Sequence, residues 1–178
     1  MALRLTEVEA YSGAGEDPAS HAHRGPTPRA DIMFGPPGRL YVYFSYGVHW
    51  CANVVVGPEG RGSAVLLRAG DVVVGEELAR SRRPAARAVR DLARGPARLT
   101  QALGIGPDDK AADLLSSSSA VRLHRGEPPS SVSAGPRVGI SQATELPWRF
   151  WETEAESVSA FRPGGTPRRR VARQDGAP

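Results

Sequence analysis

Residues 33–56 have the sequence MFGPPGRLYVYFSYGVHWCANVVV, and they decide the fold because they contain two strands around one tight turn. Residues 39–44 predict the outgoing strand, residues 45–47 the turn and residues 48–56 the returning strand. Runs of β-branched and aromatic residues on either side of a short glycine-containing turn are typical of a β-hairpin. The sequence therefore predicts a hairpin with Tyr46 at its turn.

A strand and a long loop are expected ahead of this hairpin. Residues 3–11 predict a strand on which Glu7, Glu9 and Tyr11 share one face, because side chains alternate along a strand. Residues 12–30 are rich in glycine, proline and polar residues, which predicts a long ordered loop.

The second half of the chain combines one long strand with helices and short strands. Residues 63–74 predict a strand, and residues 75–94 predict a helix that is broken or kinked at Pro84. A second helix is expected to begin near Pro96, because proline is favoured in the first helical turn. Residues 106–119 predict a linker with a short helix. Further short strands are expected at 120–126, 136–141 and 148–151.

The charge of the chain is unevenly distributed. The chain has 178 residues, near the size of one domain, and its net charge is +4. Five arginines and one aspartate lie in residues 162–178, so residues 1–161 hold 18 basic and 18 acidic side chains. Any contact with nucleic acid must therefore come from a local basic patch. The Arg-rich tail at 162–178 has no apolar periodicity, and we expect it to be disordered.

The single cysteine, Cys51, excludes an internal disulfide framework and a multi-cysteine zinc site. No apolar stretch approaches the roughly 20 residues that span a bilayer, so no membrane contact is expected. A soluble protein in a reducing compartment, the cytoplasm, is the simplest interpretation.

The tyrosines are concentrated near the N-terminus, since all four lie within the first 46 residues. Tyr41 and Tyr43 share one strand face, whereas Tyr46 lies at the hairpin turn, where the fold itself buries little of its ring. Tyr46 is either a partly exposed packing residue or a wedge for a base stack, a use that DNA-bending proteins make of large side chains.

Two other groups could carry chemistry. Glu9 precedes Tyr11 on one strand face, which suits a pocket wall where water is activated, although a solvated strand carrying Glu7 and Glu9 is the simpler interpretation of these residues alone. His21 and His23 could supply two metal ligands, but a third is missing nearby, so hydrogen-bonded loop histidines are favoured and no metal is expected.

Arginines are dense between residues 80 and 98, where seven of them accompany Asp91. Four of them have the spacing of one helical stripe, which suits contact with DNA phosphates, although a charge run is more often a solvated face. These four are Arg83, Arg87, Arg90 and Arg94.

Eight segments in this order match one enzyme family. They are EVEAYSG, DPASHAHRGPTPR, MFGPPGRLYVYFSYGVHWCANVV, AVLLRA, GPARLTQALGI, DL, PRVGIS and WRFW. They resemble the alkyladenine (3-methyladenine) DNA glycosylase family of the mammalian type, over about residues 7 to 160. The resemblance implies a single α+β glycosylase domain at 1–161, with a curved antiparallel sheet, surrounding helices and a protruding β-hairpin.

The resemblance also implies a reaction and a partner. Such an enzyme flips a damaged purine, alkylated or deaminated, out of double-stranded DNA and hydrolyses its N-glycosidic bond without a cofactor. By motif position, Glu9 matches the general base that activates water. Lys110 is the only lysine, so strand cleavage through a lysine imine is not expected. A monomer associated with the nucleoid is expected.

The resemblance assigns the remaining site residues by their motifs. Tyr11 and Tyr43 match the rings that sandwich the flipped base, with His21 at the same pocket. Asn53 matches the asparagine that clashes with the exocyclic amino group of normal guanine, and Arg68 the arginine lining the site. One further residue, Tyr46, matches the side chain that intercalates into the DNA and fills the emptied stack.

The sequence departs from the family pattern at its start. Family members usually carry some tens of residues before the Glu-Ala-Tyr strand, whereas eight residues precede Glu9 here. Either the start codon is placed late, or part of the sheet is lost and a strand edge is left open. The second case gives the alternative hypothesis, a catalytically impaired protein that binds lesions in DNA. An RNA-binding accessory domain is a third class, but it requires neither Glu9 nor Asn53.

Overall fold

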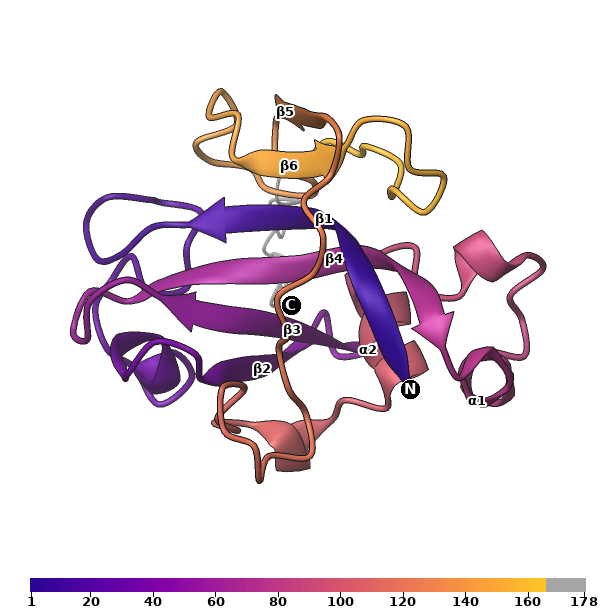
Figure 1. Cartoon of the computed structure of the whole chain (residues 1–178). Helices are drawn as coiled ribbons and strands as arrows, with labels where there is room; N and C mark the ends of the chain where they lie inside the picture. The colour runs from indigo at the N-terminus through magenta and orange to yellow at the C-terminus, as the bar shows by residue number, and fades with distance from the viewer. Residues whose placement is uncertain (166–178) are drawn as a thin grey trace, which may run out of the picture.

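Six antiparallel strands form one open sheet in the order β2-β3-β4-β1-β6-β5 (Figure 1). The structure, a computed structural model, describes residues 1–165. Most of the tail expected to be disordered, residues 166–178, therefore lies outside the described residues. The strands are β1 (Ala2–Tyr11), β2 (Leu40–Ser45), β3 (His49–Val56), β4 (Ser63–Val74), β5 (Val132–Gly135) and β6 (Arg149–Glu152).

The predicted α+β fold and its hairpin are confirmed. β2 and β3 pair from Leu40 opposite Val54 to Ser45 opposite His49, and the turn between them contains Tyr46. The long strand expected at 63–74 is β4, which pairs with both β3 and β1. Alternating apolar residues and a glycine turn were therefore sufficient to position the hairpin and its neighbour.

The middle of β1 has no open edge. It pairs with β4 on one side, and Glu7, Val8 and Glu9 pair with β6 on the other side. The open edge that loss of part of the sheet would leave, one of the two alternatives, is therefore absent at the segment that carries Glu9. The strand that closes it comes from a distant part of the chain.

Two of the short strands expected in the second half are wrong. Residues 120–126 form no ladder, and residues 136–141 follow β5 rather than form a strand. β5 ends at Gly135, directly before Pro136, which has no backbone N–H to continue the pairing. The strand expected at 148–151 is β6, one residue further along the chain.

The helices are α1 (Glu76–Arg82) and α2 (Pro96–Leu103), with short 3-10 helices η1 (Asp31–Phe34), η2 (Val89–Asp91) and η3 (Pro107–Asp109). The break expected at Pro84 in the helix at 75–94 is confirmed, but only the first part of that range is an α-helix, α1. It ends at Arg82 because the residue before a proline is disfavoured in the helical region, and Arg83 precedes Pro84 with φ −127°. The helix expected at Pro96 is confirmed as α2.

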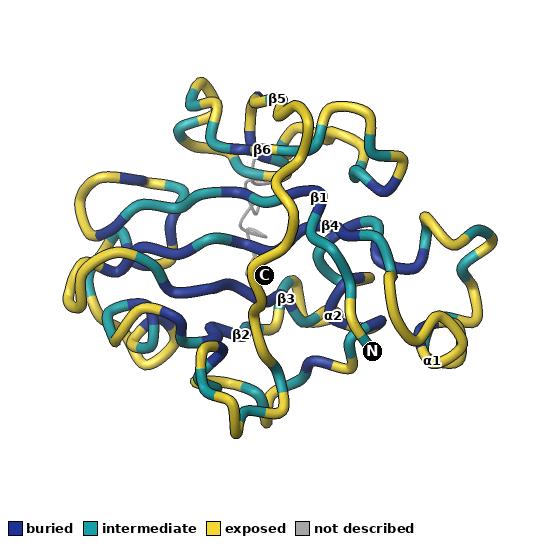
Figure 2. The backbone as a smooth tube through the Cα atoms, viewed as in Figure 1, coloured by how far each residue is buried: buried dark blue, intermediate teal, exposed yellow. Residues whose placement is uncertain are grey.

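The core lies on both faces of the sheet. One cluster packs β2, β3 and β4 against α2 and contains Leu40, Val54 and Leu99. The second packs Tyr41 and Val55 against the loop and η1 on the opposite face. Figure 2 shows that β3 and β4 are buried along most of their length, whereas the connecting loops are exposed. Among residues 1–165, no helix is long and apolar enough to cross a membrane.

Candidate active site

A cavity of about 670 Å³ opens beside the β2–β3 hairpin. Its wall is built from β1, the loop at 12–30, the three strands β2 to β4 and the segment after β5. Six side chains expected at the site from the sequence line it. They are Tyr11, His21, Tyr43, Tyr46, Asn53 and Arg68.

Glu9 is fully buried directly behind this wall. Its Oε2 accepts a hydrogen bond from the Tyr11 hydroxyl at 2.9 Å, and its Oε1 accepts one from the Val138 amide at 2.7 Å. The Arg68 guanidinium lies 3.2 Å from Oε1. The solvated strand that the residues alone favoured is therefore wrong, because Glu9 is a buried carboxylate held by two hydrogen bonds and one ion pair. A carboxylate offers about four acceptor positions, more than these three contacts occupy.

Tyr11 serves as a neutral donor in this arrangement. Burial and the adjacent charge of Glu9 raise the pKa of its phenol far above the ordinary value. The hydroxyl therefore keeps its proton at neutral pH and donates a hydrogen bond to Glu9, while the ring lines the cavity.

Three rings form the opposite side of the cavity. Tyr41 and Tyr43 stack with centroids 5.5 Å apart, as their shared strand face predicts, and His21 meets Tyr43 edge-on at 4.6 Å. His21 Nδ1 lies 3.0 Å from the Tyr41 hydroxyl. Desolvation and the charge of Arg29 lower the pKa of His21, so its imidazole is neutral at pH 7. These three rings therefore give the cavity an uncharged aromatic surface, which suits a flat heterocycle.

Asn53 and Tyr46 have contrasting environments. The Asn53 side chain is buried and donates from Nδ2 to the Tyr41 carbonyl at 3.2 Å, which fixes its orientation. Tyr46 is 90% exposed and has φ +50°, a left-handed backbone that is strained for a bulky residue. Strain of this kind persists where the surrounding structure imposes it and is concentrated at functional sites. The hairpin therefore holds the Tyr46 ring out in solvent.

A second buried ion pair lies next to the site, and no sequence pattern predicted it. Arg137 donates from Nη1 and Nη2 to Asp17 at 2.6 and 2.9 Å, and both side chains are fully buried. Its guanidinium also packs against two aromatic rings, those of Tyr11 and Trp148. The two partners are 120 residues apart, so no local pattern could have linked them.

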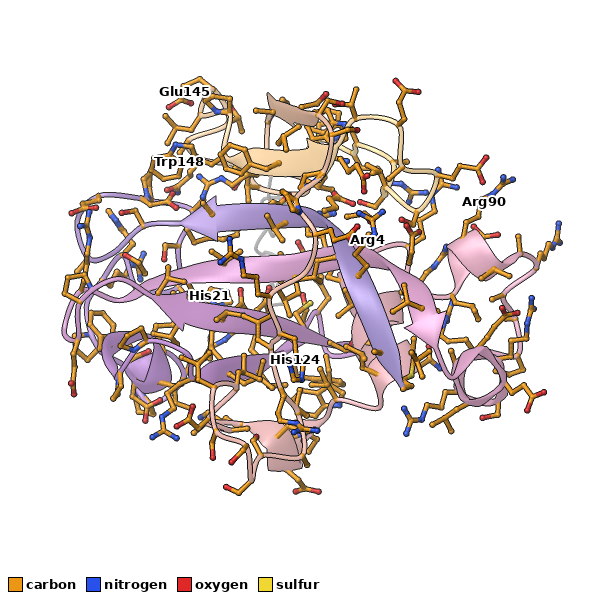
Figure 3. The ribbon with its side chains drawn as sticks, in the orientation of Figure 1. Arg4, His21, Arg90, His124, Glu145 and Trp148 are labelled. Carbon is orange, nitrogen blue, oxygen red and sulfur yellow. The ribbon has the colours of Figure 1, made fainter. Side chains whose placement is uncertain are left out.

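The arginines expected on one helical stripe do not share a helix face. α1 ends at Arg82, so all four lie on irregular chain or in η2. They are Arg83, Arg87, Arg90 and Arg94. Arg90 reaches Glu156 at 3.1 Å, and Arg94 donates to the Val158 carbonyl at 2.8 Å. In Figure 3, Arg90 projects from the end of the molecule opposite to His21.

Comparison with known proteins gives one consistent result. A protein of Nocardia farcinica is 52% identical over 168 residues, which is 91% of this chain and 79% of the relative. A Frankia casuarinae protein is 53% identical over 184 residues, with 94% of this chain and 84% of the relative covered. Both carry the name "Putative 3-methyladenine DNA glycosylase". Residues 1–156 match the family described as methylpurine-DNA glycosylase. With its resemblance thus confirmed, the chain belongs to the methylpurine-DNA glycosylase family, a family of DNA-repair enzymes.

Proposed function

We propose that this protein excises alkylated or deaminated purines from double-stranded DNA by flipping the base and hydrolysing its N-glycosidic bond. The observation that carries the proposal is the position of Glu9, a buried carboxylate behind an aromatic cavity of about 670 Å³. Chemistry on a base requires that the base leave the stack, and a cavity of this kind can receive it.

The chemistry follows from the contacts of Glu9. Its free acceptor position orients a water molecule, and the carboxylate takes a proton as the water oxygen bonds to C1′ of the sugar. The bond from C1′ to the purine nitrogen breaks, and its electron pair leaves with the base. An N-alkylated purine carries a positive charge, so this electron pair neutralises it and no acid is needed. The Glu9 charge also balances the positive charge that develops on the sugar.

The walls of the cavity favour damaged purines. Tyr11 and Tyr43 offer aromatic faces on which a flat base stacks, and a cationic base gains a further ~0.5–2 kcal/mol from such faces. Asn53 is fixed by its hydrogen bond to the Tyr41 carbonyl, so it cannot move aside for the exocyclic amino group of guanine.

Tyr46 supplies the wedge. Its ring is held in solvent at the turn beside the cavity and is free to enter the space that the flipped base leaves. Filling this space offsets the unstacking, which costs a few kcal/mol.

The lysine position supports simple hydrolysis without strand cleavage. Lys110 is the only lysine, and its amine lies 3.9 Å from Asp31 rather than among the residues that line the cavity. An imine between a lysine and the sugar therefore has no amine within the site.

The test is single-turnover excision on duplexes that contain hypoxanthine or 3-methyladenine. The wild type should release the base, whereas Glu9→Gln should lose release yet still bind a duplex that contains an abasic-site mimic. Glu145→Gln, a change at an exposed glutamate (Figure 3), is the matched control and should act as the wild type does. Excision by Glu9→Gln near the wild-type rate would disprove the role of Glu9.

A further inference from the structure

We propose that Glu7 is a positioning residue for the hydrolysis. The Glu7 carboxylate holds the Arg68 guanidinium in place and offsets part of its positive charge. Glu7 thereby determines how strongly Arg68 stabilises the negative charge of Glu9. This inference rests on the proposed function, in which Glu9 accepts the proton of water.

Glu7 is as deeply buried as Glu9 and has more donors. Its Oε1 accepts hydrogen bonds from Arg68 Nε and Arg149 Nε, both at 2.7 Å, and from the Ser159 hydroxyl at 2.9 Å. Its Oε2 accepts the Ser159 amide at 2.7 Å. Burial raises the pKa of Glu7, but the Arg68 charge and the Ser159 hydrogen bonds outweigh it and hold that pKa below the ordinary value. Glu7 is therefore a fixed negative charge, and its hydrogen bonds leave no room for a substrate.

Arg68 connects the two carboxylates. Its Nε donates to Glu7, its Nη2 donates to the Ser159 hydroxyl at 3.1 Å, and its Nη1 lies 3.2 Å from Glu9 Oε1. A guanidinium is a rigid planar fork, so two held corners fix the position of the third. Glu7 and Ser159 therefore aim Nη1 at Glu9.

The cluster is also balanced in charge. Arg68 and Arg149 carry two positive charges, and Glu7 and Glu9 carry two negative charges, all four side chains being nearly or fully buried. If the charge of Glu7 is removed, Arg68 has Glu9 as its remaining carboxylate partner. The ionised form of Glu9 is then favoured too strongly, and the carboxylate becomes a weaker base toward water.

Other titratable and charged groups also face Glu9, and they come from every strand or segment around it. They are Tyr11 on β1, Cys51 on β3, Arg68 on β4, Arg149 opposite Glu9 on β6 and Arg137 in the segment after β5. Only Arg68 and Arg149 among them also bind Glu7. Opposite charge changes at Glu7 and Arg149 can therefore separate an electrostatic role of Glu7 from a packing role.

The experiment measures single-turnover excision of hypoxanthine against pH with the full chain. Glu7→Gln should move the acidic limb of the profile to lower pH by roughly one unit, and it should lower the plateau. Arg149→Met leaves excess negative charge and should move the limb to higher pH. The double variant restores the charge balance, and its limb should return toward that of the wild type.

Three further variants keep the inference testable if Glu7→Gln does not fold. Ser159→Ala changes no charge but releases one corner of Arg68, so the plateau should fall several-fold with the limb in place. Glu7→Asp retains the charge, so its limb should stay near that of the wild type. Arg4→Met removes a half-buried charge from the same strand, where Arg4 pairs with Asp71 and Glu152 rather than with Glu7 or Glu9, and should move neither the limb nor the plateau.

The outcomes separate this inference from the proposed function. If the wild type releases no base, the proposed function fails. If the wild type is active and the limb stays fixed in the charge variants, or moves in the same direction in both, Glu7 has only a packing role and the inference is wrong.

Discussion

Asp17 and Arg137 form a bidentate ion pair in which both side chains are fully buried, with N–O distances of 2.6 and 2.9 Å. Arg137 also donates to the Ala10 carbonyl at 3.0 Å, and its guanidinium lies 4.6 Å from the centroid of the Tyr11 ring. The pair therefore connects the loop at 12–30 to the segment after β5 across the back of Tyr11. The Tyr11 wall of the cavity is therefore supported from behind by a charge pair that does not itself line the cavity.

Breaking this pair should destabilise the protein strongly. Arg137→Met leaves Asp17 buried without its partner, which typically costs about 3–5 kcal/mol. The free energy of unfolding, measured by urea denaturation, should fall by this amount. In the double variant Asp17→Asn/Arg137→Met no charge is left uncompensated, and a substantial part of the loss should be recovered. A loss below about 1 kcal/mol in Arg137→Met would mean that the pair contributes little.

Stability should fall in acid because two buried carboxylates have lowered pKa values in the folded state. Burial raises the pKa of Asp17 and Glu7, but Arg137 and Arg68 respectively lower it to a net value below the ordinary range. A group of this kind stabilises the fold above its unfolded pKa, about 4, and the contribution is lost as the pH falls toward the folded value. With two groups, the unfolding free energy should drop by up to about 2.7 kcal/mol per pH unit below that point.

Urea denaturation between pH 7 and pH 3 measures this slope. In Asp17→Asn/Arg137→Met one of the two carboxylates is absent, so the slope should be about half that of the wild type. An equal slope in both proteins would assign the acid sensitivity to other carboxylates.

Tyr46→Ser should separate excision from stability. The ring is 90% exposed, so its loss should change the melting temperature little. Serine has a Cβ atom as tyrosine does, so the strain of the left-handed backbone at position 46 should be similar in the variant. Without the ring the flipped state loses roughly 1–3 kcal/mol of stacking, so excision should fall about ten- to hundredfold. The loss should be smaller for a mispaired lesion, because such a base is easier to extrude.

Tyr46→Phe keeps the aromatic ring and is the matched control, with excision near that of the wild type. If the melting temperature of Tyr46→Ser collapses while excision per folded molecule stays normal, Tyr46 is a packing residue rather than a wedge.

Arginines near α1 should contribute to DNA binding through phosphates, although they do not share a helix face. Arg87 and Arg90 are exposed, so Arg87→Gln/Arg90→Gln should weaken binding to damaged and undamaged duplexes equally. Each lost phosphate contact reduces the slope of log affinity against log salt by about 0.9. An unchanged slope in a salt titration would mean that these arginines are only solvated.

The parts of the fold that follow local rules could be predicted from the sequence. The hairpin is determined by alternating residues around Tyr46 and Gly47, and α2 by Gly95 and Pro96 at its start. The helix expected at 75–94 breaks at Pro84 as predicted, but no α-helix resumes in residues 85–94, where only the short η2 forms. β5 escaped prediction because VSAG is short and weakly apolar, and its pairing with β6 rather than its own sequence makes it a strand.

The same distinction holds for the site. Six of the residues that line the cavity are on segments with motifs and could be named from the sequence, whereas others, such as Arg29 and Met33, could not. The ion network behind them could not, because Glu7 binds Arg68, Arg149 and Ser159 at separations of 61, 142 and 152 residues. Single charged residues in a sequence carry no information about such distant partners.

These separations also determine when the site can exist during protein synthesis. Glu7 is made with the first strand, whereas Arg149 and Ser159 are added after nearly all of the described chain. A nascent chain that has left the ribosome only as far as β4 has Arg68 but lacks the other two donors that Glu7 requires when buried. Folding around Glu7 and Glu9 must therefore wait for the last segments, and a chain that ends before them cannot complete the ion network behind the cavity.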